Sequence, residues 1–551
     1  MTTQRPSTGT LPALDRRALM KAGILGAGLI GTPLAARIGG RGFTHGVASG
    51  EPGRDSVLLW SRYVGYQPAR LSYEVATDLA FAQTVAGGEV EAAPDRDWCV
   101  KTTAAGLEPG RWYYYRFLAP DGTASDIGRT RTLPEGPTEA FRMGVFSCSN
   151  LGFGWFNAYA HAAEADDIDL AIHVGDYFYE YPVGTYPARE QALAQRLDLT
   201  PDTETVSLAD YRLRYATYRR DQDLRRLHQL FPMIAQWDDH ESANDSYADG
   251  AENHQSDTEG DWQVRKAAAM RAYREWMPVS DEPWATYDIG DLATLIRVET
   301  RLTARSKPPS LESVLVGKAD PADIAAALTT FRDTEYADAA RTVLGQAQEA
   351  WLAGALAASK RSGKRWQVLS QQVLMGSLRT PQALADGLTD EAPAFARARI
   401  QAAALAGSQG IPFNMDAWDG YPAARARVFE AALEADADLV VLAGDTHNAW
   451  AFDLTHEGAR VGVEFGGQSV TSPGFEAYIP LPADTLAGSM VAGNDQLRWA
   501  NLKDRGYMRV ELTPRSARAE YRFSDTVRQR STRLSGTHRI ATEVGERRLG
   551  V

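Results

Sequence analysis

Three short stretches of the chain carry side chains that bind metal ions, although they lie far apart in the sequence. They are 175–180 (Gly-Asp-Tyr-Phe-Tyr-Glu), 237–241 (Trp-Asp-Asp-His-Glu) and 444–448 (Gly-Asp-Thr-His-Asn). Each follows an apolar run typical of a buried strand, and these runs are 170–174, 233–236 and 439–443. In open α/β sheets, loops at the carboxyl ends of strands bring chelating groups to one point. The sequence therefore predicts one metal site assembled from three strand ends.

A tyrosine and a cysteine favour ferric iron for one position of this site. Asp176 is placed to bridge two ions, and Tyr179, three residues later, could reach the same ion. Deprotonating a phenol near neutral pH requires a strong Lewis acid, which points to Fe³⁺. Cys148, after another probable strand, would be a second strong donor as a thiolate. Taken alone, Cys148 would be a buried structural cysteine or half of a bridge to Cys99.

The second and third motifs add carboxylates and imidazoles. Asp445 and His447 flank one residue, so their side chains could face the same cluster in an extended or turning segment. Asp239 and His240 are adjacent and would point differently, which suits one metal ligand and one proton donor. We expect His240 to protonate a leaving alkoxide, with a nearby carboxylate such as Glu241 or Asp238 raising its basicity.

The remaining donors favour a second, harder cation. Oxygen ligands without further histidine suit Ca²⁺ or Mg²⁺ more than zinc, so we expect Fe³⁺ with Ca²⁺, and Mg²⁺ could replace the calcium. Asn150 and Asn244 are either additional ligands or solvated loop residues. Arg301 follows the apolar run 292–298, where it could clamp a substrate phosphate or form a surface salt bridge.

The N-terminus indicates export. Arg16 and Arg17 precede an apolar, glycine-rich stretch over 22–36, and this order is typical of a Tat signal, which we assign to 1–37. The stretch is shorter than the roughly 20 residues of a membrane span. We therefore expect a partner in the Tat export machinery, no stable membrane span, and a periplasmic or secreted protein. The Tat route carries folded proteins, which suits a protein that acquires its metal before export.

The length of 551 residues predicts two or more domains. Short alternating segments over 43–135 predict an N-terminal β-sandwich, and alternating strands and helices over 139–525 predict an α/β catalytic domain, followed by a C-terminal extension at 526–551. Within the catalytic region, 210–230 is a helix candidate and 242–261 is a polar loop. The net charge of −13 argues against a broad nucleic-acid surface, so no nucleic-acid partner is required.

In combination, these residues resemble the alkaline phosphatase D (PhoD-like) metallophosphoesterases. The resemblance runs from 45–52 and 60–62, through the three motifs, to 418–421 and 466–474. It implies a calcineurin-like αββα sandwich behind a fibronectin/Ig-like β-sandwich. It also implies that Cys148, Asp176, Tyr179 and His447 hold iron, that Asp176, Asp239 and Asp445 serve calcium, and that His240 is the acid.

The resemblance implies a phosphoesterase that hydrolyses extracytoplasmic monoesters, diesters or both, by attack of a metal-bound hydroxide. The alternatives are a phospholipase D-type or wall-polymer phosphodiesterase and, outside the enzymes, an exported binding protein with a structural metal. The chain departs from the family at Glu299, where an aspartate is usual, and at Arg305, which comes one position late. We expect the surroundings of Glu299 and Arg301 to decide the substrate.

Overall fold

The computed structural model describes residues 40–318, 320–388, 394–479 and 481–550. The predicted export signal at 1–37 lies outside the described residues. None of the helices in the described ranges has the length and hydropathy of a membrane span.

The first sheet contains the strands that precede two of the predicted motifs. Its strand order is β20-β19-β18-β8-β9-β10-β1-β2-β5. The predicted strands at 170–174 and 233–236 are confirmed as β9 (Leu170–His173) and β10 (Met233–Ala235), which run parallel to each other and to β8 (Phe141–Phe146). Antiparallel strands extend the sheet on one side: β18 (Gly506–Leu512), β19 (Ser516–Ser524) and β20 (Leu534–Glu543).

The second sheet has the order β11-β12-β13-β14-β16-β15-β17. Its strands are β11 (Ala285–Ile289), β12 (Ala293–Arg297), β13 (Trp366–Ser370), β14 (Leu439–Ala443), β15 (Ala449–His456), β16 (Ala459–Gly466) and β17 (Leu497–Asn501). The predicted strand at 439–443 is confirmed as β14, and β12, β13, β14 and β16 are parallel. Apolar residues of both sheets form one core cluster, so the sheets pack face to face.

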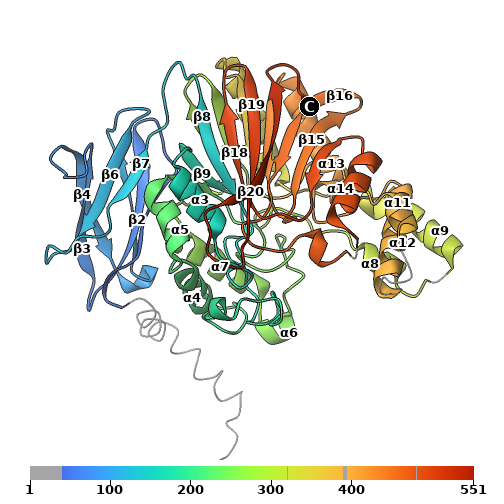
Figure 1. Cartoon of the computed structure of the whole chain (residues 1–551), viewed down its shortest axis with the longest axis horizontal. Coiled ribbons are helices and arrows are strands. Elements are labelled where there is room, and N and C mark those ends of the chain that lie inside the picture. The colour runs from blue at the N-terminus through green and yellow to red at the C-terminus, as the bar shows by residue number, and fades with distance from the viewer. Residues whose placement is uncertain (1–39, 319, 389–393, 480, 551) are drawn as a thin grey trace, which may run out of the picture.

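Helices cover the outer faces of these sheets (Figure 1). The first sheet is covered by α3 (Asn157–Ala165), α4 (Leu208–Tyr218), α5 (Gln222–Leu230) and α7 (Trp262–Trp276), which share a core cluster with its strands. The second is covered by α10 (Gly345–Arg361), α13 (Pro422–Glu434) and α14 (Ala483–Gly493). A separate group at one end of the molecule comprises α8 (Leu311–Leu315), α9 (Pro321–Phe331), α11 (Gln382–Asp386) and α12 (Ala394–Ser408).

The expectation of one helix over 210–230 is wrong, because the chain breaks between α4 and α5. Asp221 sits at the break in an extended conformation and accepts hydrogen bonds from the backbone N–H groups of Asp223 and Leu224. Such a cap starts a new helix. The polar segment 242–261 contains only the short helix α6 (Ser256–Glu259) among turns, in line with a loop.

The N-terminal region is joined to the α/β region that follows it through the first sheet. A third sheet, blue in Figure 1, has the order β4-β3-β6-β7 and consists of β3 (Ala69–Ala76), β4 (Thr84–Ala92), β6 (Trp112–Leu118) and β7 (Gly128–Arg131). It shares a core cluster with β1 (Gly42–Gly50), β2 (Ser56–Val64) and β5 (Cys99–Ala105). Those strands belong to the first sheet, because β1 pairs with β10 through Gly50 and Met233.

Candidate metal centre

The predicted ligands all follow strands of the two facing sheets. Cys148 comes after β8, Asp176 after β9 and Asp239 after β10, all in the first sheet, whereas Asp445 and His447 follow β14 in the second. β8, β9 and β10 are parallel to one another in the first sheet, and β14 is parallel to β13 in the second, so the loops at their carboxyl ends can meet. The fold therefore brings residues almost 300 positions apart into contact, as the 3.8 Å separation of Cys148 Sγ from the Asp445 carbonyl oxygen demonstrates.

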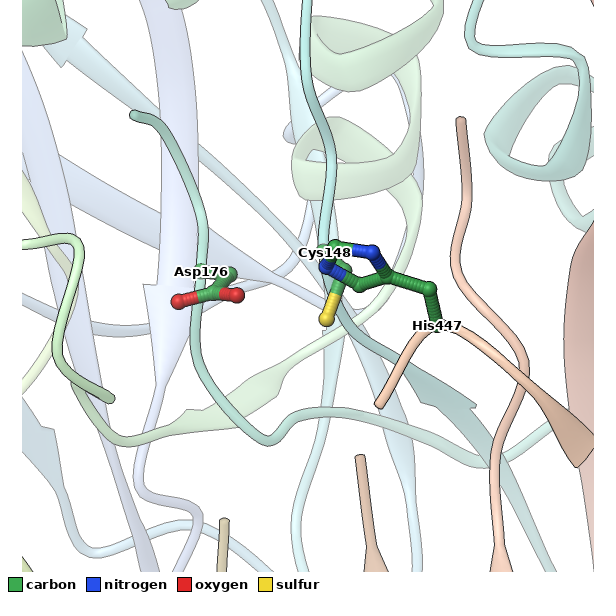
Figure 2. A group of neighbouring side chains, drawn as sticks. All are labelled: Cys148, Asp176 and His447. Atoms are coloured by element: carbon green, nitrogen blue, oxygen red, sulfur yellow. The ribbon is translucent and has the colours of Figure 1, made fainter. Parts of the chain in front are cut away.

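One donor group matches the predicted iron ligands. Candidate ligand atoms of Cys148, Asp176 and His447 all lie within 4.8 Å of one another, and Figure 2 shows the three side chains converging from separate segments. The Tyr179 hydroxyl lies 3.2 Å from Asp176 Oδ2 and 3.0 Å from His447 Nε2. Thiol, phenol, imidazole and carboxylate thus face one small volume.

Two further groups extend the cluster with carboxylates. Asp176, Asp239 and His240 form one, and Asp238, Asp239 and Asp445 form the other, each with candidate ligand atoms within 4.8 Å. Asp176 also belongs to the group that contains Cys148. A ligand that bridges two ions must lie between two such groups, as Asp176 does. Asp238 was not among the predicted ligands. Its place beside Asp239 in the same motif is the signal that could have indicated it.

The backbone is strained at several of these residues. Cys148, Asp176, Asp445 and His447 have φ values of 58°, 54°, 67° and 65°. Residues other than glycine seldom adopt this left-handed region, and such strain concentrates at functional sites. The surrounding fold therefore holds these side chains in positions that the local backbone would not choose.

The electrostatics of the cluster fit a bound cation. Burial raises the pKa of Asp176 and of Asp445 well above the usual range, and it raises the pKa of Asp238 to about 7. Burial likewise raises the pKa values of the Cys148 thiol and the Tyr179 phenol. Within the described residues, Asp176 Oδ1 and Asp238 Oδ2 are buried without a hydrogen-bond partner. A multivalent cation would satisfy these oxygens and favour the ionised ligands.

His447 is oriented as a metal ligand. Its Nδ1 lies 2.7 Å from the Pro473 carbonyl oxygen, to which it donates a hydrogen bond. That bond fixes the tautomer and leaves Nε2, which faces the Tyr179 hydroxyl, unprotonated. Burial lowers the pKa of His447 to about 3, so the ring is neutral. Ser472 Oγ donates to the Tyr179 hydroxyl over 2.7 Å and so holds the phenol beside the imidazole.

His240 is paired with a carboxylate from the first motif. Its Nδ1 lies 2.7 Å from Glu180 Oε2, and the other oxygen of Glu180 accepts bonds from Asn244 N and Asn253 Nδ2. Burial alone would lower the pKa of His240, but Asp239 and Glu180 raise it well above the ordinary value. The two carboxylates expected beside His240 have other partners: Glu241 accepts hydrogen bonds from backbone N–H groups, and Asp238 accepts one from Arg301 Nε.

Arg301 is fully buried, which excludes the surface salt bridge considered from the sequence. Its guanidinium donates to Asp238 and Asp416, and its Nη2 lies 3.3 Å from Asp445 Oδ1. Arg305 donates to the same Asp416. The guanidinium therefore binds the carboxylates around the centre.

Glu299 faces its own turn. Its carboxylate accepts hydrogen bonds from the backbone N–H groups of Arg301, Leu302 and Thr303 and from Trp237 Nε1. The Glu299 side chain therefore connects the segment after β12 to Trp237 of the second motif. This is a structural role that the sequence did not suggest.

The two asparagines differ in their surroundings. The Asn150 amide bonds to Gly152 N and the Tyr186 carbonyl oxygen, so both its ends hold loop backbone. Asn244 is only partly buried and donates to Glu252. Cys99 and Cys148 are both free and buried, so the bridge between them, which the sequence left open, is not formed.

Comparison with known proteins places this site in a family. The sequence model of the PhoD-like phosphatases matches residues 143–521, and the model of their N-terminal domain matches residues 30–134. Alkaline phosphatase D of Bacillus subtilis (strain 168) is 32% identical over 527 residues, which cover 90% of this chain and 79% of that protein. A solved structure of PhoD is similar with a TM-score of 0.73 and 29% identity, over 92% of this chain and 91% of that chain. The chain therefore belongs to the PhoD-like phosphatases and is a phosphoric ester hydrolase.

Proposed function

We propose that this hydrolase cleaves extracytoplasmic phosphate monoesters, diesters or both at a mixed Fe³⁺ and Ca²⁺ centre. The observation that carries the proposal is that Asp176 belongs both to the group with Cys148 and to the group with Asp239 and His240. A soft and strongly donating ligand set on one side and a hard oxygen set on the other suit two different cations.

The ligands divide accordingly. Cys148, Asp176, Tyr179 and His447 would hold Fe³⁺, and Asp176, Asp239 and Asp445 would hold Ca²⁺, or Mg²⁺ in its place. Asp238 joins the second set as a candidate, and Asn150 and Asn244 remain candidate additional ligands. When bound, the ions supply Lewis acidity for the phosphoryl oxygens and a water of lowered pKa.

The protein supplies the proton and the alignment. We assign His240 as the acid that protonates the departing alkoxide, because Glu180 orients its ring and favours its charged form. Arg301 holds Asp238 and Asp445 at the centre, and in the proposed phosphate clamp its Nη2 would exchange Asp445 for a phosphoryl oxygen.

We assign the fold to the calcineurin-like αββα sandwiches with an N-terminal fibronectin/Ig-like sandwich at 43–135 and a catalytic region at 139–525. The facing sheets, their outer helices and the core cluster shared by β1, β2, β5 and the third sheet support this assignment. The pairing of β20 with β19 supports counting the segment 526–551 with the catalytic region. We also propose Tat-dependent export to the periplasm or medium, on the strength of the arginine pair in 1–37.

Reconstitution tests the function. Protein stripped of metal and reloaded with iron and calcium should hydrolyse p-nitrophenyl phosphate, bis-p-nitrophenyl phosphate or both, and the stripped protein should not. Failure of the reloaded protein on both esters would contradict the proposal. Elemental analysis and a visible charge-transfer band test the iron assignment, and zinc alone would contradict it. Faster turnover of a phospholipid or teichoic acid than of either nitrophenyl ester would favour the phospholipase D-type or wall-polymer alternative.

A further inference from the structure

Glu241 ends the second motif, but its buried carboxylate turns toward the backbone of two metal-binding loops. Its Oε1 accepts a hydrogen bond of 2.7 Å from Tyr177 N, and its Oε2 accepts bonds of 3.1 Å from Asp176 N and 2.9 Å from Asp238 N. Tyr177 and Asp176 belong to the loop after β9, and Asp238 belongs to the loop after β10. One side chain therefore joins the loop of the bridging ligand to the loop of the second motif.

The two loops are also in direct contact at Gly175. This residue has a φ of 106°, and a Cβ atom there would lie 2.3 Å from Asp238 Cβ and 2.7 Å from Asp238 N. Only glycine allows this approach. The contact at Gly175 therefore sets how closely the two loops can approach each other. The hydrogen bonds to Glu241 keep the loops from moving apart.

The chemistry of these bonds requires a carboxylate. Three buried N–H groups point at one side chain, and a carboxylate has two oxygens that only accept, so it can satisfy all three. A glutamine of the same shape has one accepting oxygen and an NH₂ group that would face a backbone N–H. Loss of one bond would leave a buried donor unsatisfied, and the loops could then relieve the conflict only by moving apart.

We propose that Glu241 is a positioning residue that sets the spacing between Asp176 and the Asp238–Asp239 pair, and thereby the affinity of the centre for its second cation. The inference rests on the proposed metal centre and goes beyond it, because Glu241 is not a predicted ligand and acts through the loops that carry the ligands. Groups that orient metal ligands typically change metal affinity about 10- to 100-fold when they are replaced.

A matched pair of substitutions tests this role. Glu464 on β16 is also a buried carboxylate that accepts backbone N–H groups, those of Met375 and Gly376, but these belong to the segment after β13, which carries none of the candidate ligands. Calcium is titrated calorimetrically into wild type, Glu241→Gln and Glu464→Gln after removal of divalent ions. We expect calcium to bind about 10- to 100-fold more weakly to Glu241→Gln and with wild-type affinity to Glu464→Gln. Raised calcium should also restore the turnover of Glu241→Gln.

The outcomes separate this inference from the proposed function. Wild-type affinity in Glu241→Gln, or an equal loss in both variants, would overturn the positioning role and leave the metal centre intact. A wild-type protein that binds neither calcium nor magnesium would overturn the proposed second cation position itself. If Glu241→Gln does not fold, hydrogen exchange in calcium-free wild type decides: slow exchange at the amides of Asp176 and Tyr177 supports the anchoring, and exchange as fast as in an open loop overturns it.

Discussion

Asp176 is the residue on which both halves of the centre depend. Its carboxylate belongs to the group with Cys148 and His447 and to the group with Asp239 and His240. Its φ of 54° is imposed by the loop, and one of its oxygens has no hydrogen-bond partner among the described residues. A residue that is strained, buried and short of a partner gains from binding a cation, whereas an ordinary turn aspartate would be solvated.

Asp176→Asn should therefore abolish most activity with little change in fold. Asparagine tolerates the left-handed backbone and keeps the volume, but it removes the bridging charge. We expect kcat on p-nitrophenyl phosphate to fall about 100-fold or more, together with metal content measured by elemental analysis. Asp166→Asn is the control, because Asp166 also has a positive φ of 47° but caps α3 away from the site. Full metal content with full activity in Asp176→Asn would reject the bridging role.

The acid role of His240 can be tested by the choice of leaving group. General acids typically contribute about 10²- to 10⁴-fold to the rate. We expect His240→Gln to lose kcat in this range on an alkyl phosphate and much less on p-nitrophenyl phosphate, because nitrophenolate departs without a proton. His161→Gln on α3, where the ring bonds to Tyr507 outside the centre, should leave both rates unchanged. Equal losses on the two substrates would indicate that His240 has another role.

At the scale of elements, the sequence predicted the strands that end at the motifs, because β9, β10 and β14 are short apolar runs before glycine or acidic residues. It did not predict the break between α4 and α5, because arginines occur on both sides of it and the break depends on the cap at Asp221. It also missed Glu180 as the partner of His240, since this pairing joins loops from two strands and leaves no local pattern.

Asp221 has two structural roles at this break, and its loss should be costly. Besides capping α5, it accepts a hydrogen bond of 2.7 Å from Arg196 Nη1 in a buried ion pair. Removing one partner of such a pair typically costs about 3–5 kcal/mol. Ser207 caps α4 at an exposed position, where a lost cap costs about 1 kcal/mol. We expect urea unfolding to rank Asp221→Ala well below Ser207→Ala in stability, and similar values would contradict the importance of the buried pair.

At the scale of the whole molecule, sheet connections between distant segments could not be predicted. The sequence divides 43–135 from the catalytic region, yet β1 pairs with β10 and residues of β1, β2 and β5 contribute to the core beneath α4, α5 and α7. Pairing of this kind depends on three-dimensional contacts between segments almost 200 residues apart and leaves no periodicity in either segment. The same holds for the centre, whose motifs were recognisable but whose mutual distances were not.

The centre joins the two sheets, so metal should stabilise the molecule as a whole. Cys148, Asp176 and Asp239 come from the first sheet and Asp445 and His447 from the second, and without a cation their buried acids disfavour the ionised state. A ligand present at about 1,000 times its Kd stabilises the folded state by about 4 kcal/mol. We therefore expect a calcium chelator to lower the Tm of wild type and of Glu464→Gln, measured by calorimetry, and to leave that of Asp176→Asn nearly unchanged. An identical Tm of wild type with and without the chelator would mean that calcium does not bind between the sheets, because an ion held by donors from both must resist their separation.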